Sequence, residues 1–291
     1  MVVSFLFRAV SPNPIEMDVF SGFYVRGIFF SLLKSVDPEL ATAVHEERTL
    51  SPYSTSSLEN TQGRKIFFGT VPPGSFFQFR ITTLRNSVSD ALARSLTEVS
   101  PPSIEVNRVR ANVSEVVVEH FGGQLSGSSS EHSRYEVVFR TPTFFRNTQK
   151  GPGVLQLLLP RRLRRKVKPV YRYVIVPDPY HFFRNLARLY RQFCKPNFPY
   201  RSYCEWLLEG GVALETYDGL KVYKVYDSDG TWSRGFVGRA VFSVPKDLYD
   251  GRMAKITGEL LEFARFSNVG GNRTAGFGVI DYRVADSRES G

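Results

Sequence analysis

An order of strand-like and helix-like hydrophobic patterns that occurs twice along the chain limits its fold more than any other feature. Residues 2–10 alternate between apolar and polar side chains, as a half-buried strand does, and residues 23–35 carry apolar side chains at helical spacing. The first half then predicts, in order, a short helix over 38–46, strands over 53–58, 65–70 and 76–83, a helix over 86–96 and a strand over 113–120. This order approximates β-α-β-β-α-β.

The second half repeats this order in outline. Its patterns predict a strand over 135–140, a helix over 180–193, paired strands over 211–226 and 232–244, a helix over 248–265 and a strand over 277–284. The order β-α-β-β-α-β is that of ferredoxin-like domains, which RNA-recognition motifs also adopt. The sequence therefore predicts an α+β protein with two tandem ferredoxin-like (RRM-like) domains.

A boundary between the two domains is expected near the middle of the chain. Residues 122–133, GGQLSGSSSEHS, contain few large apolar side chains and many flexible ones, as a linker does. A chain of 291 residues also has room for two domains of ordinary size. We expect an N-terminal domain over residues 1–124 and a C-terminal domain over residues 133–291.

Composition narrows the class of protein. With 42% hydrophobic and 23% charged residues, the chain is close to globular averages, which argues against disorder and fibrous repeats. No apolar stretch approaches the roughly 20 residues that span a bilayer, and no basic leader precedes the first apolar run, so we expect a cytoplasmic protein. Cys194 and Cys204 lack a second pair that would complete a zinc site, so we expect reduced thiols, no metal and no cofactor.

Positive charge is in excess and is concentrated in one run. The 38 Lys and Arg residues against 28 Asp and Glu give a formal charge of +10, which indicates a polyanionic partner, nucleic acid first. The basic run lies over residues 161–168. A run of like charges is usually a solvated loop, but an outside anion relieves the repulsion among its side chains, so we favour contact with an RNA backbone. The candidate RNA-binding residues in the run are Arg161, Arg162, Arg164, Arg165, Lys166 and Lys168.

A glycine-rich loop over residues 268–278, NVGGNRTAGFG, is the sharpest local motif. It follows a predicted helix and precedes a predicted strand, whereas phosphate loops of nucleotide-binding proteins join a strand to a following helix, so a nucleotide cofactor is disfavoured. Glycines still allow backbone N–H groups to approach an anion closely, and Arg273 adds charge. The loop is thus either a turn without a ligand or a contact for RNA. Its candidate RNA-binding residues are Gly270, Gly271, Asn272, Arg273, Gly276 and Gly278.

Three N-terminal stretches accompany this loop in a fixed order: residues 26–34 (RGIFFSLLK), 37–46 (DPELATAVHE) and 52–58 (PYSTSSL). With the loop ending in Ala-Gly-Phe-Gly and running straight into a strand, the chain resembles the CRISPR repeat-processing endoribonucleases of the repeat-associated mysterious protein superfamily. The resemblance extends over essentially the whole chain, is strongest at its two ends and is thin between about 125 and 210.

The resemblance implies tandem ferredoxin-like domains, binding of CRISPR repeat RNA and metal-independent cleavage of a precursor transcript into guide RNAs. In that reaction a ribose 2′-hydroxyl displaces the 5′-oxygen of the next nucleotide and leaves a 2′,3′-cyclic phosphate. The reaction requires a base, an acid and positive charge against the crowded phosphorane. A CRISPR effector complex is a further candidate partner, and the chain is expected to be a monomer or a homodimer.

His45 is the candidate catalytic residue that the resemblance implies, because it falls where the family places its catalytic histidine. Imidazole suits this role, since it accepts or donates a proton near neutral pH. Without the resemblance, a histidine followed by Glu46 and Glu47 would be interpreted as a surface residue. His120, His132 and His181 match no motif and are expected to be structural or exposed.

Two positions depart from family members that use a Tyr, His and Lys set. Phe30 stands where those members carry tyrosine on the first helix, and Ser51 stands where they carry lysine, six residues after the histidine. Phenylalanine cannot donate a proton. The candidates that could supply the missing donor and charge are Tyr24, Arg26 and Arg48.

Two alternatives to the endoribonuclease stay open. One is a repeat-RNA-binding protein of the same fold that does not cut, which Phe30 and Ser51 favour and His45 opposes. The other is a basic structural or assembly protein, which agrees with the net charge but leaves the ordered motifs unexplained.

Overall fold

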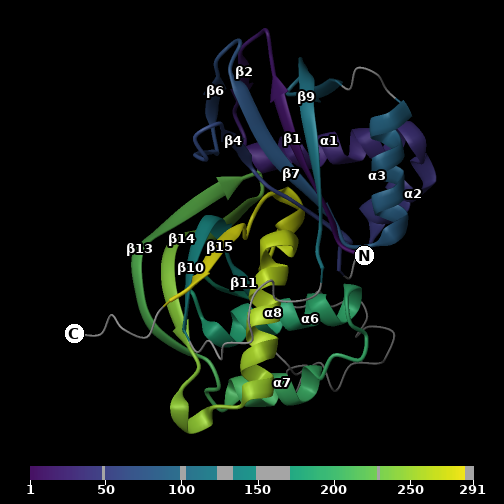
Figure 1. Ribbon diagram of the computed structural model, residues 1–291. Helices are drawn as coiled ribbons and strands as arrows, with labels where there is room; N and C mark the ends of the chain where they lie inside the picture. Colours follow the sequence, from purple (N-terminus) through teal and green to yellow (C-terminus); the bar gives the residue numbers. More distant parts are fainter. Residues whose placement is uncertain (48–49, 99–102, 123–133, 149–170, 228–229, 286–291) are drawn as a thin grey trace, which may run out of the picture.

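The computed structural model contains two antiparallel sheets, each packed against its own group of helices (Figure 1). The structure describes residues 1–47, 50–98, 103–122, 134–148, 171–227 and 230–285. All strands of the first sheet precede residue 121, and all strands of the second sheet follow residue 133. The residues of the predicted linker from 123 to 133 lie outside the described part, so a domain boundary there stays a prediction.

The first sheet has the order β5-β4-β7-β1-β9-β8, with β3 paired to β7. Its strands are β1 (Val3–Val10), β3 (Tyr53–Thr55), β4 (Leu58–Asn60), β5 (Lys65–Ile66), β7 (Phe76–Thr83), β8 (Ser103–Val106) and β9 (Val109–His120). A separate pair joins β2 (Ile15–Met17) to β6 (Gly69–Val71). The helices beside this sheet are α1 (Ser21–Val36), α2 (Pro38–Glu46) and α3 (Asn86–Glu98). Alternation on β7 turns Phe77, Phe79 and Ile81 toward these helices, where they are buried.

The second sheet has the order β13-β14-β10-β15. Its strands are β10 (Arg134–Thr143), β13 (Ala213–Tyr226), β14 (Trp232–Ser243) and β15 (Ile280–Val284). A small separate sheet pairs β11 (Phe145–Thr148) with β12 (Tyr171–Val174), and the helices are α6 (Pro179–Phe193), α7 (Tyr200–Leu208) and α8 (Gly251–Ser267). In both sheets the first strand of the unit, β1 or β10, lies between two partners. The prediction of an α+β protein with tandem ferredoxin-like folds is confirmed.

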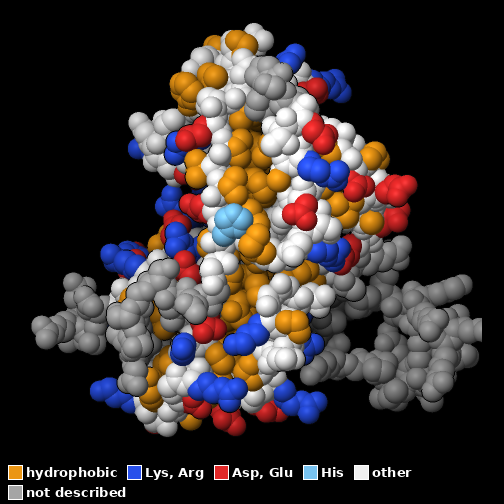
Figure 2. All heavy atoms as spheres, turned by 45° about the vertical axis from the view of Figure 1, so that its right-hand side comes forward, with side chains coloured by type: hydrophobic (Ala, Val, Ile, Leu, Met, Phe, Trp, Pro, Cys, Tyr) orange, Lys and Arg blue, Asp and Glu red, His pale blue; other side chains and the backbone are white. Residues whose placement is uncertain are grey.

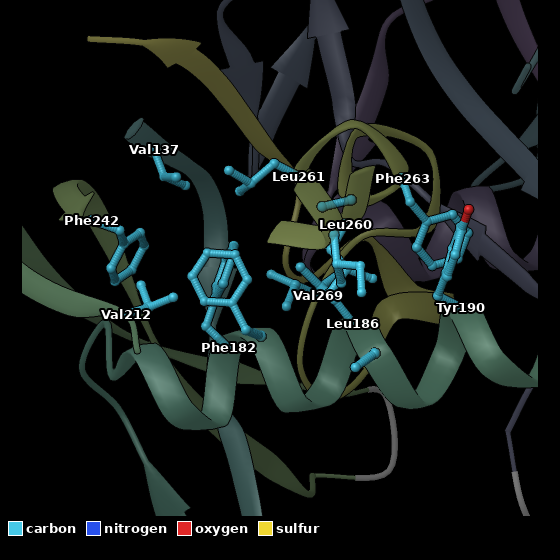
Figure 3. Close-up of a cluster of buried hydrophobic side chains, with 14 of the residues drawn as sticks. Val137, Phe182, Leu186, Tyr190, Val212, Phe242, Leu260, Leu261, Phe263 and Val269 are labelled. Carbon is cyan, nitrogen blue, oxygen red and sulfur yellow. The ribbon is translucent and has the colours of Figure 1, made fainter. Parts of the chain in front are cut away.

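Helix α6 begins where the sequence provides both a cap and a proline. The Asp178 side chain accepts a hydrogen bond from the backbone N–H of His181 at 2.7 Å, and Pro179 occupies the first turn. Phe182, Leu186 and Tyr190 recur every four residues and point from α6 toward α8 and the sheet (Figure 3). Each such side chain, when fully buried, contributes about 1.5–3 kcal/mol, so this face fixes the position of the helix.

Several predicted elements differ from the observed ones for local reasons. The strands predicted over 53–58 and 65–70 are each two short strands, and the first is interrupted at Ser56, whose hydroxyl accepts a hydrogen bond from the Arg80 N–H at 2.8 Å. Strands β11 and β12, helix α7 and strand β8 were not predicted. Strand β8 joins β9 through a tight turn in which Asn107 and Arg108 both have positive φ, a conformation that favours glycine. The helix predicted over 248–265 begins later, because Asp250 caps it at Gly251.

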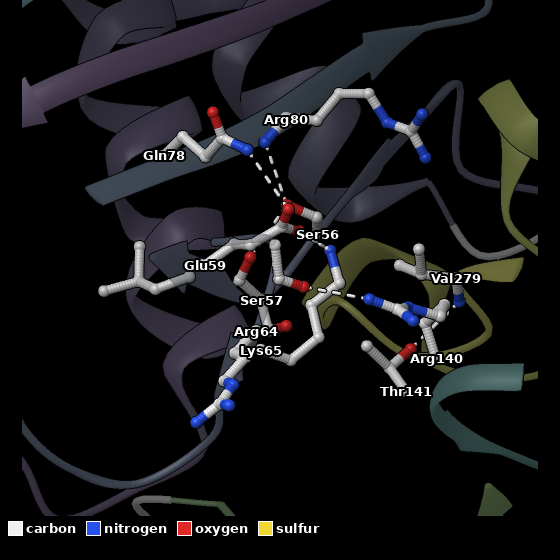
Figure 4. Close-up of polar contacts among 12 residues, drawn as sticks. Ser56, Ser57, Glu59, Arg64, Lys65, Gln78, Arg80, Arg140, Thr141 and Val279 are labelled. Atoms are coloured by element: carbon white, nitrogen blue, oxygen red, sulfur yellow. Dashed lines mark hydrogen bonds and ion pairs between the residues drawn. The ribbon is translucent and has the colours of Figure 1, made fainter. Parts of the chain in front are cut away.

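Buried contacts join the two halves. An aromatic cluster at the junction contains Phe20 of the first half and Phe144 and Phe277 of the second. At the same junction, the Arg140 guanidinium of β10 donates to the Gly63 carbonyl oxygen at 2.9 Å (Figure 4). Beside this contact, Glu59 pairs with Lys65 and accepts from the Gln78 amide at 3.1 Å. The halves therefore pack together through both apolar and polar contacts.

Candidate nucleic-acid interface

A pocket of about 330 Å³ lies where the two halves meet. The first half contributes residues 50–51, which follow α2. The second half contributes residues of β11 and α6, Tyr200 of α7 and residues 270–274 of the glycine-rich loop. The pocket therefore exists only because the two halves pack together.

The pocket is strongly basic. Its lining includes the guanidinium groups of Arg146, Arg184, Arg188 and Arg273, and no Asp or Glu is among the described residues that line it. On the face shown in Figure 2, by contrast, positive and negative side chains are interspersed around a strip of hydrophobic ones. Guanidinium groups form paired hydrogen bonds with phosphate oxygens. The charge and geometry of the pocket suit a phosphodiester.

The glycines of the loop have a structural reason to be glycine. A Cβ at Gly270 would lie 2.3 Å from the Phe144 carbonyl oxygen, and one at Gly278 would lie 1.8 Å from the Val269 carbonyl oxygen. Gly276 has φ +80° and packs against the backbone of Ser56. Of the predicted RNA-binding loop residues, the structure places Gly270, Gly271, Asn272 and Arg273 at the pocket, whereas Gly276 and Gly278 contact protein backbone.

Arg273 ties the loop to both halves. Its side chain is 6% exposed, and it donates to the carbonyl oxygens of Ser267 at 2.8 Å and Ser51 at 3.1 Å. Burial, assisted by the nearby Arg188, lowers the pKa of Arg273 to about 10, so the guanidinium stays charged at neutral pH. Asn268 also donates to the Thr55 carbonyl oxygen at 2.7 Å. The loop is thus held by hydrogen bonds across the junction.

His45 lies in the last turn of α2 and is exposed to solvent. Its ring is 5.2 Å from that of Phe30, and Phe30 is 5.6 Å from Tyr53, measured between ring centroids. Tyr53 is buried, which raises its pKa to about 12 despite the opposing effects of Arg26, Thr274 and Arg273 near its hydroxyl. Two ring contacts therefore separate the His45 imidazole from the glycine-rich loop.

The other candidate residues of the first half are engaged by carboxylates. The Tyr24 hydroxyl donates to Asp18, and burial with this hydrogen bond raises the pKa of Tyr24 to about 12. Arg26 pairs with Asp227 at 3.7 Å and lies over the Phe23 ring. Arg48 and the whole predicted basic run from Arg161 to Lys168 lie outside the described residues.

Sequence reasoning missed the contribution of α6 to the pocket. His181, Arg184 and Arg188 occur at spacings of three and four, which places them on one face of the helix. The His181 Nδ1 lies 2.6 Å from the Asp178 carboxylate, and this contact orients the imidazole ring. Asn185 accepts from the Gly270 N–H at 2.8 Å. The basic spacing was visible in the sequence, but nothing in it showed which surface this helix face meets.

The described part of the chain was also searched for metal ligands, membrane-spanning helices and reactive thiols. No group of three or more His, Cys, Asp and Glu side chains there could hold a metal ion. No helix in it combines the length and apolar character needed to cross a membrane. Cys194 and Cys204 are free thiols, and burial raises the pKa of Cys194 to about 12, which leaves it a poor nucleophile at neutral pH.

Comparisons with known proteins agree with this architecture. The chain is similar over 97% of its length to Thermus thermophilus Cas6 (TTHB231) in a product complex, with 22% identity, 99% coverage of that chain and a TM-score of 0.71. A second Cas6 product complex (TTHA0078) gives 21% identity, coverage of 97% and 100%, and a TM-score of 0.67. A Cas6-related protein from Pyrococcus furiosus gives 12% identity, coverage of 98% and 99%, and a TM-score of 0.59.

The similar structures support the fold, and a match to a family model adds evidence from the sequence. No curated protein matches the chain. The family model described as CRISPR-associated endoribonuclease Cas6 matches residues 137–280, which include helix α6, the β13–β14 hairpin and the glycine-rich loop. This match covers just under half of the chain, and the structural likenesses extend the tandem ferredoxin-like fold of the solved Cas6 structures over nearly all of it.

Proposed function

We propose that this protein binds CRISPR repeat RNA and cuts the precursor transcript into guide RNAs without a metal ion. The observation that carries the proposal is the pocket where the glycine-rich loop meets the segment that follows His45, because its described lining contains four arginines and no carboxylate. The family description as endoribonucleases supports it, as do similar structures solved as a product complex and as a substrate mimic complex.

In this proposal the pocket holds the phosphodiester backbone of the repeat. Attack by a ribose 2′-hydroxyl gathers negative charge on the phosphorane oxygens, and guanidinium groups fixed beforehand stabilise that charge more than water does. Arg184 and Arg188 project from α6, whose apolar face is anchored in the core, so their backbone positions are set before RNA arrives. The product would be a 2′,3′-cyclic phosphate.

Arg273 is our candidate for the positive charge that a lysine supplies in relatives at the position of Ser51. The guanidinium of Arg273 donates to the Ser51 carbonyl oxygen at 3.1 Å, so a permanent charge lies beside this position. Arg273 comes from the second half of the chain, whereas His45 and Ser51 come from the first half. In this proposal, residues of both halves therefore form the catalytic site.

His45 is our candidate for proton transfer, as the base for the 2′-hydroxyl or the acid for the leaving 5′-oxygen. Its exposure leaves the imidazole accessible to RNA, and the edge contact with Phe30 restricts the ring. Phe30 itself holds no proton to donate. Proton transfer therefore depends more on His45 here than in a site that also contains a tyrosine hydroxyl.

A second candidate function is that of a repeat-RNA-binding protein that does not cut. Phe30 and Ser51 favour it, since they replace the proton donor and the cation of the Tyr, His and Lys set. The two candidates share the pocket and differ only in turnover.

Incubation of purified protein with repeat RNA in excess EDTA tests the proposal. The endoribonuclease is expected to release defined fragments at an undiminished rate when divalent metals are removed. Binding without fragments in either the presence or the absence of EDTA would support the non-cleaving candidate. Fragments that form only when a divalent metal is added would contradict metal-independent cleavage.

Removal of the α6 charges is expected to weaken binding in a salt-dependent way. Arg184→Gln and Arg188→Gln should each raise the Kd for repeat RNA and reduce the slope of log Kd against log salt by about 0.7, the value for one phosphate contact with a single strand. Lys255→Gln, an exposed lysine on α8 outside the pocket lining, is the matched control and should leave the slope unchanged. Equal slopes for all four proteins would exclude these arginines as phosphate contacts.

A further inference from the structure

The free end of the β13–β14 hairpin presents aromatic and basic side chains together. Tyr226 pairs directly with Trp232, and Lys224 pairs with Arg234, so all four side chains point to one side of the hairpin. We call these four residues the outer face. Trp232 is 51% exposed and Tyr226 is 48% exposed, so both rings are accessible to a ligand.

The opposite side of the same hairpin end is packed. Val225 is buried in the aromatic cluster that joins the two halves, and Tyr223 contacts the Phe67 ring edge-on. Strand alternation therefore fixes the hairpin by one side and leaves the outer face free. The exposure of Trp232 and Tyr226 does not come from a loosely attached hairpin.

Cations lie over the exposed rings of the outer face. The Lys224 ammonium is 4.8 Å from the centroid of Tyr226 and 4.7 Å from that of Trp232, and the Arg234 guanidinium is 5.0 Å from Trp232. The four residues of the outer face include two cations and no carboxylate. At an exposed position a cation–π contact is weaker than the stacking of a nucleic-acid base on the same ring. An arriving base can therefore displace the cations, which then remain close enough to pair with its phosphates.

The outer face lies next to the basic pocket. Phe236 follows Arg234 on the same side of β14 and contacts Phe145, which lines the pocket, with ring centroids 6.3 Å apart. Ser233 lies between Trp232 and Arg234 on the packed side of the hairpin, and it accepts from the side-chain amide of Asn272, another residue of the pocket lining, at 3.1 Å. The hairpin that carries the outer face therefore contacts the lining of the pocket.

We propose that the outer face binds unpaired RNA next to the segment held in the pocket, with a base stacked on Trp232 or Tyr226 and phosphates paired with Lys224 and Arg234. This rests on the proposed function in that the strand in the pocket is RNA. Stacking accepts any base, so the face adds affinity and positions the strand without reading its sequence. Exposed aromatic rings can also bind a peptide, but the two cations of the outer face and the neighbouring basic pocket favour a polyanion.

The test compares substitutions at Trp232 by the Kd for fluorescently labelled repeat RNA at fixed salt. Trp232→Ala should raise Kd about 5- to 30-fold, as loss of one stacked base does. Trp232→Phe keeps a ring and should stay within about threefold of the parent. Trp232→Leu keeps apolar bulk without a ring and should resemble the alanine variant. Tyr217→Ala removes another exposed aromatic of β13, outside the face, and should stay within twofold.

Two results would overturn the proposal: a Trp232→Ala protein within twofold of the parent, as a protein-docking role predicts, or recovery by Trp232→Leu equal to that by Trp232→Phe. A parent protein that binds repeat RNA without cutting it contradicts the cleavage proposal alone, and the Kd ratios still decide the role of the outer face. A parent protein that binds no RNA overturns both proposals.

Discussion

Replacement of His45 by alanine is expected to lower the rate of repeat-RNA cleavage by about 10²- to 10⁴-fold, the usual contribution of a general acid or base. The Kd should change little, because His45 is exposed outside the pocket lining and the arginines that grip the strand remain. Single-turnover rates at saturating protein separate the chemical step from binding. The folded structure should be preserved, since only an edge contact with Phe30 is lost.

His120→Ala is the matched control for this experiment. His120 is another exposed histidine, at the end of β9, and its removal should leave the cleavage rate unchanged. A His45→Ala rate within threefold of the parent would move proton transfer to another group. His181 would then be the next candidate, because it lines the pocket and is oriented by Asp178.

Substitution of Gly22 by alanine is expected to lower the free energy of unfolding by about 1–3 kcal/mol, as overpacking does. A Cβ at Gly22 would lie 2.1 Å from the carbonyl oxygen of Ala275, so the first turn of α1 and the glycine-rich loop must separate. Because the Ala275 carbonyl belongs to the backbone, no rotamer change relieves this clash. The displaced loop should also bind repeat RNA more weakly. Urea unfolding measures the first effect, and titration with RNA measures the second.

Gly27→Ala on the same helix provides the control. A Cβ at Gly27 meets no atom within 4 Å, so the substitution should raise the free energy of unfolding by about 0.5–1 kcal/mol through helix propensity. Opposite signs for two Gly→Ala changes in one helix would locate the effect at the contact with the loop. Equal changes in the two variants would show that this contact contributes nothing.

The sequence patterns predicted those strands and helices whose conformation depends mainly on residues close together in the sequence. Alternation over 76–83 and the aromatic-rich helix predicted over 180–193 each have a strong sequence signature, and the observed strand and helix each pack into a core. The tight turn at Asn107 and Arg108 carries no glycine, so β8 had no visible turn signal. Helix α7 spans nine residues, and such short helices owe their stability mainly to packing rather than to propensity.

The candidate site was predictable only in pieces. Sequence motifs singled out the glycine-rich loop and His45, but the basic pocket that the loop lines arises from packing of the two halves. Arg273 shows the limit most clearly: as a cation at a polar loop tip it is expected to face solvent, yet its guanidinium is buried on two carbonyl oxygens. His181 shows the converse, since a histidine in the first turn of a helix gives no sign of the pocket that it lines.

In the proposed reaction, the RNA's own 2′-hydroxyl cleaves the backbone while the protein positions it. Two repeat RNAs that differ only by a 2′-deoxyribose at the nucleotide before the cut test this claim directly, because the deoxy RNA should bind equally well but lacks the attacking group. The all-ribose RNA is expected to be cleaved to a 2′,3′-cyclic phosphate end, and the deoxy RNA is expected to stay intact at that position. Cleavage of the deoxy RNA at a comparable rate would contradict this mechanism.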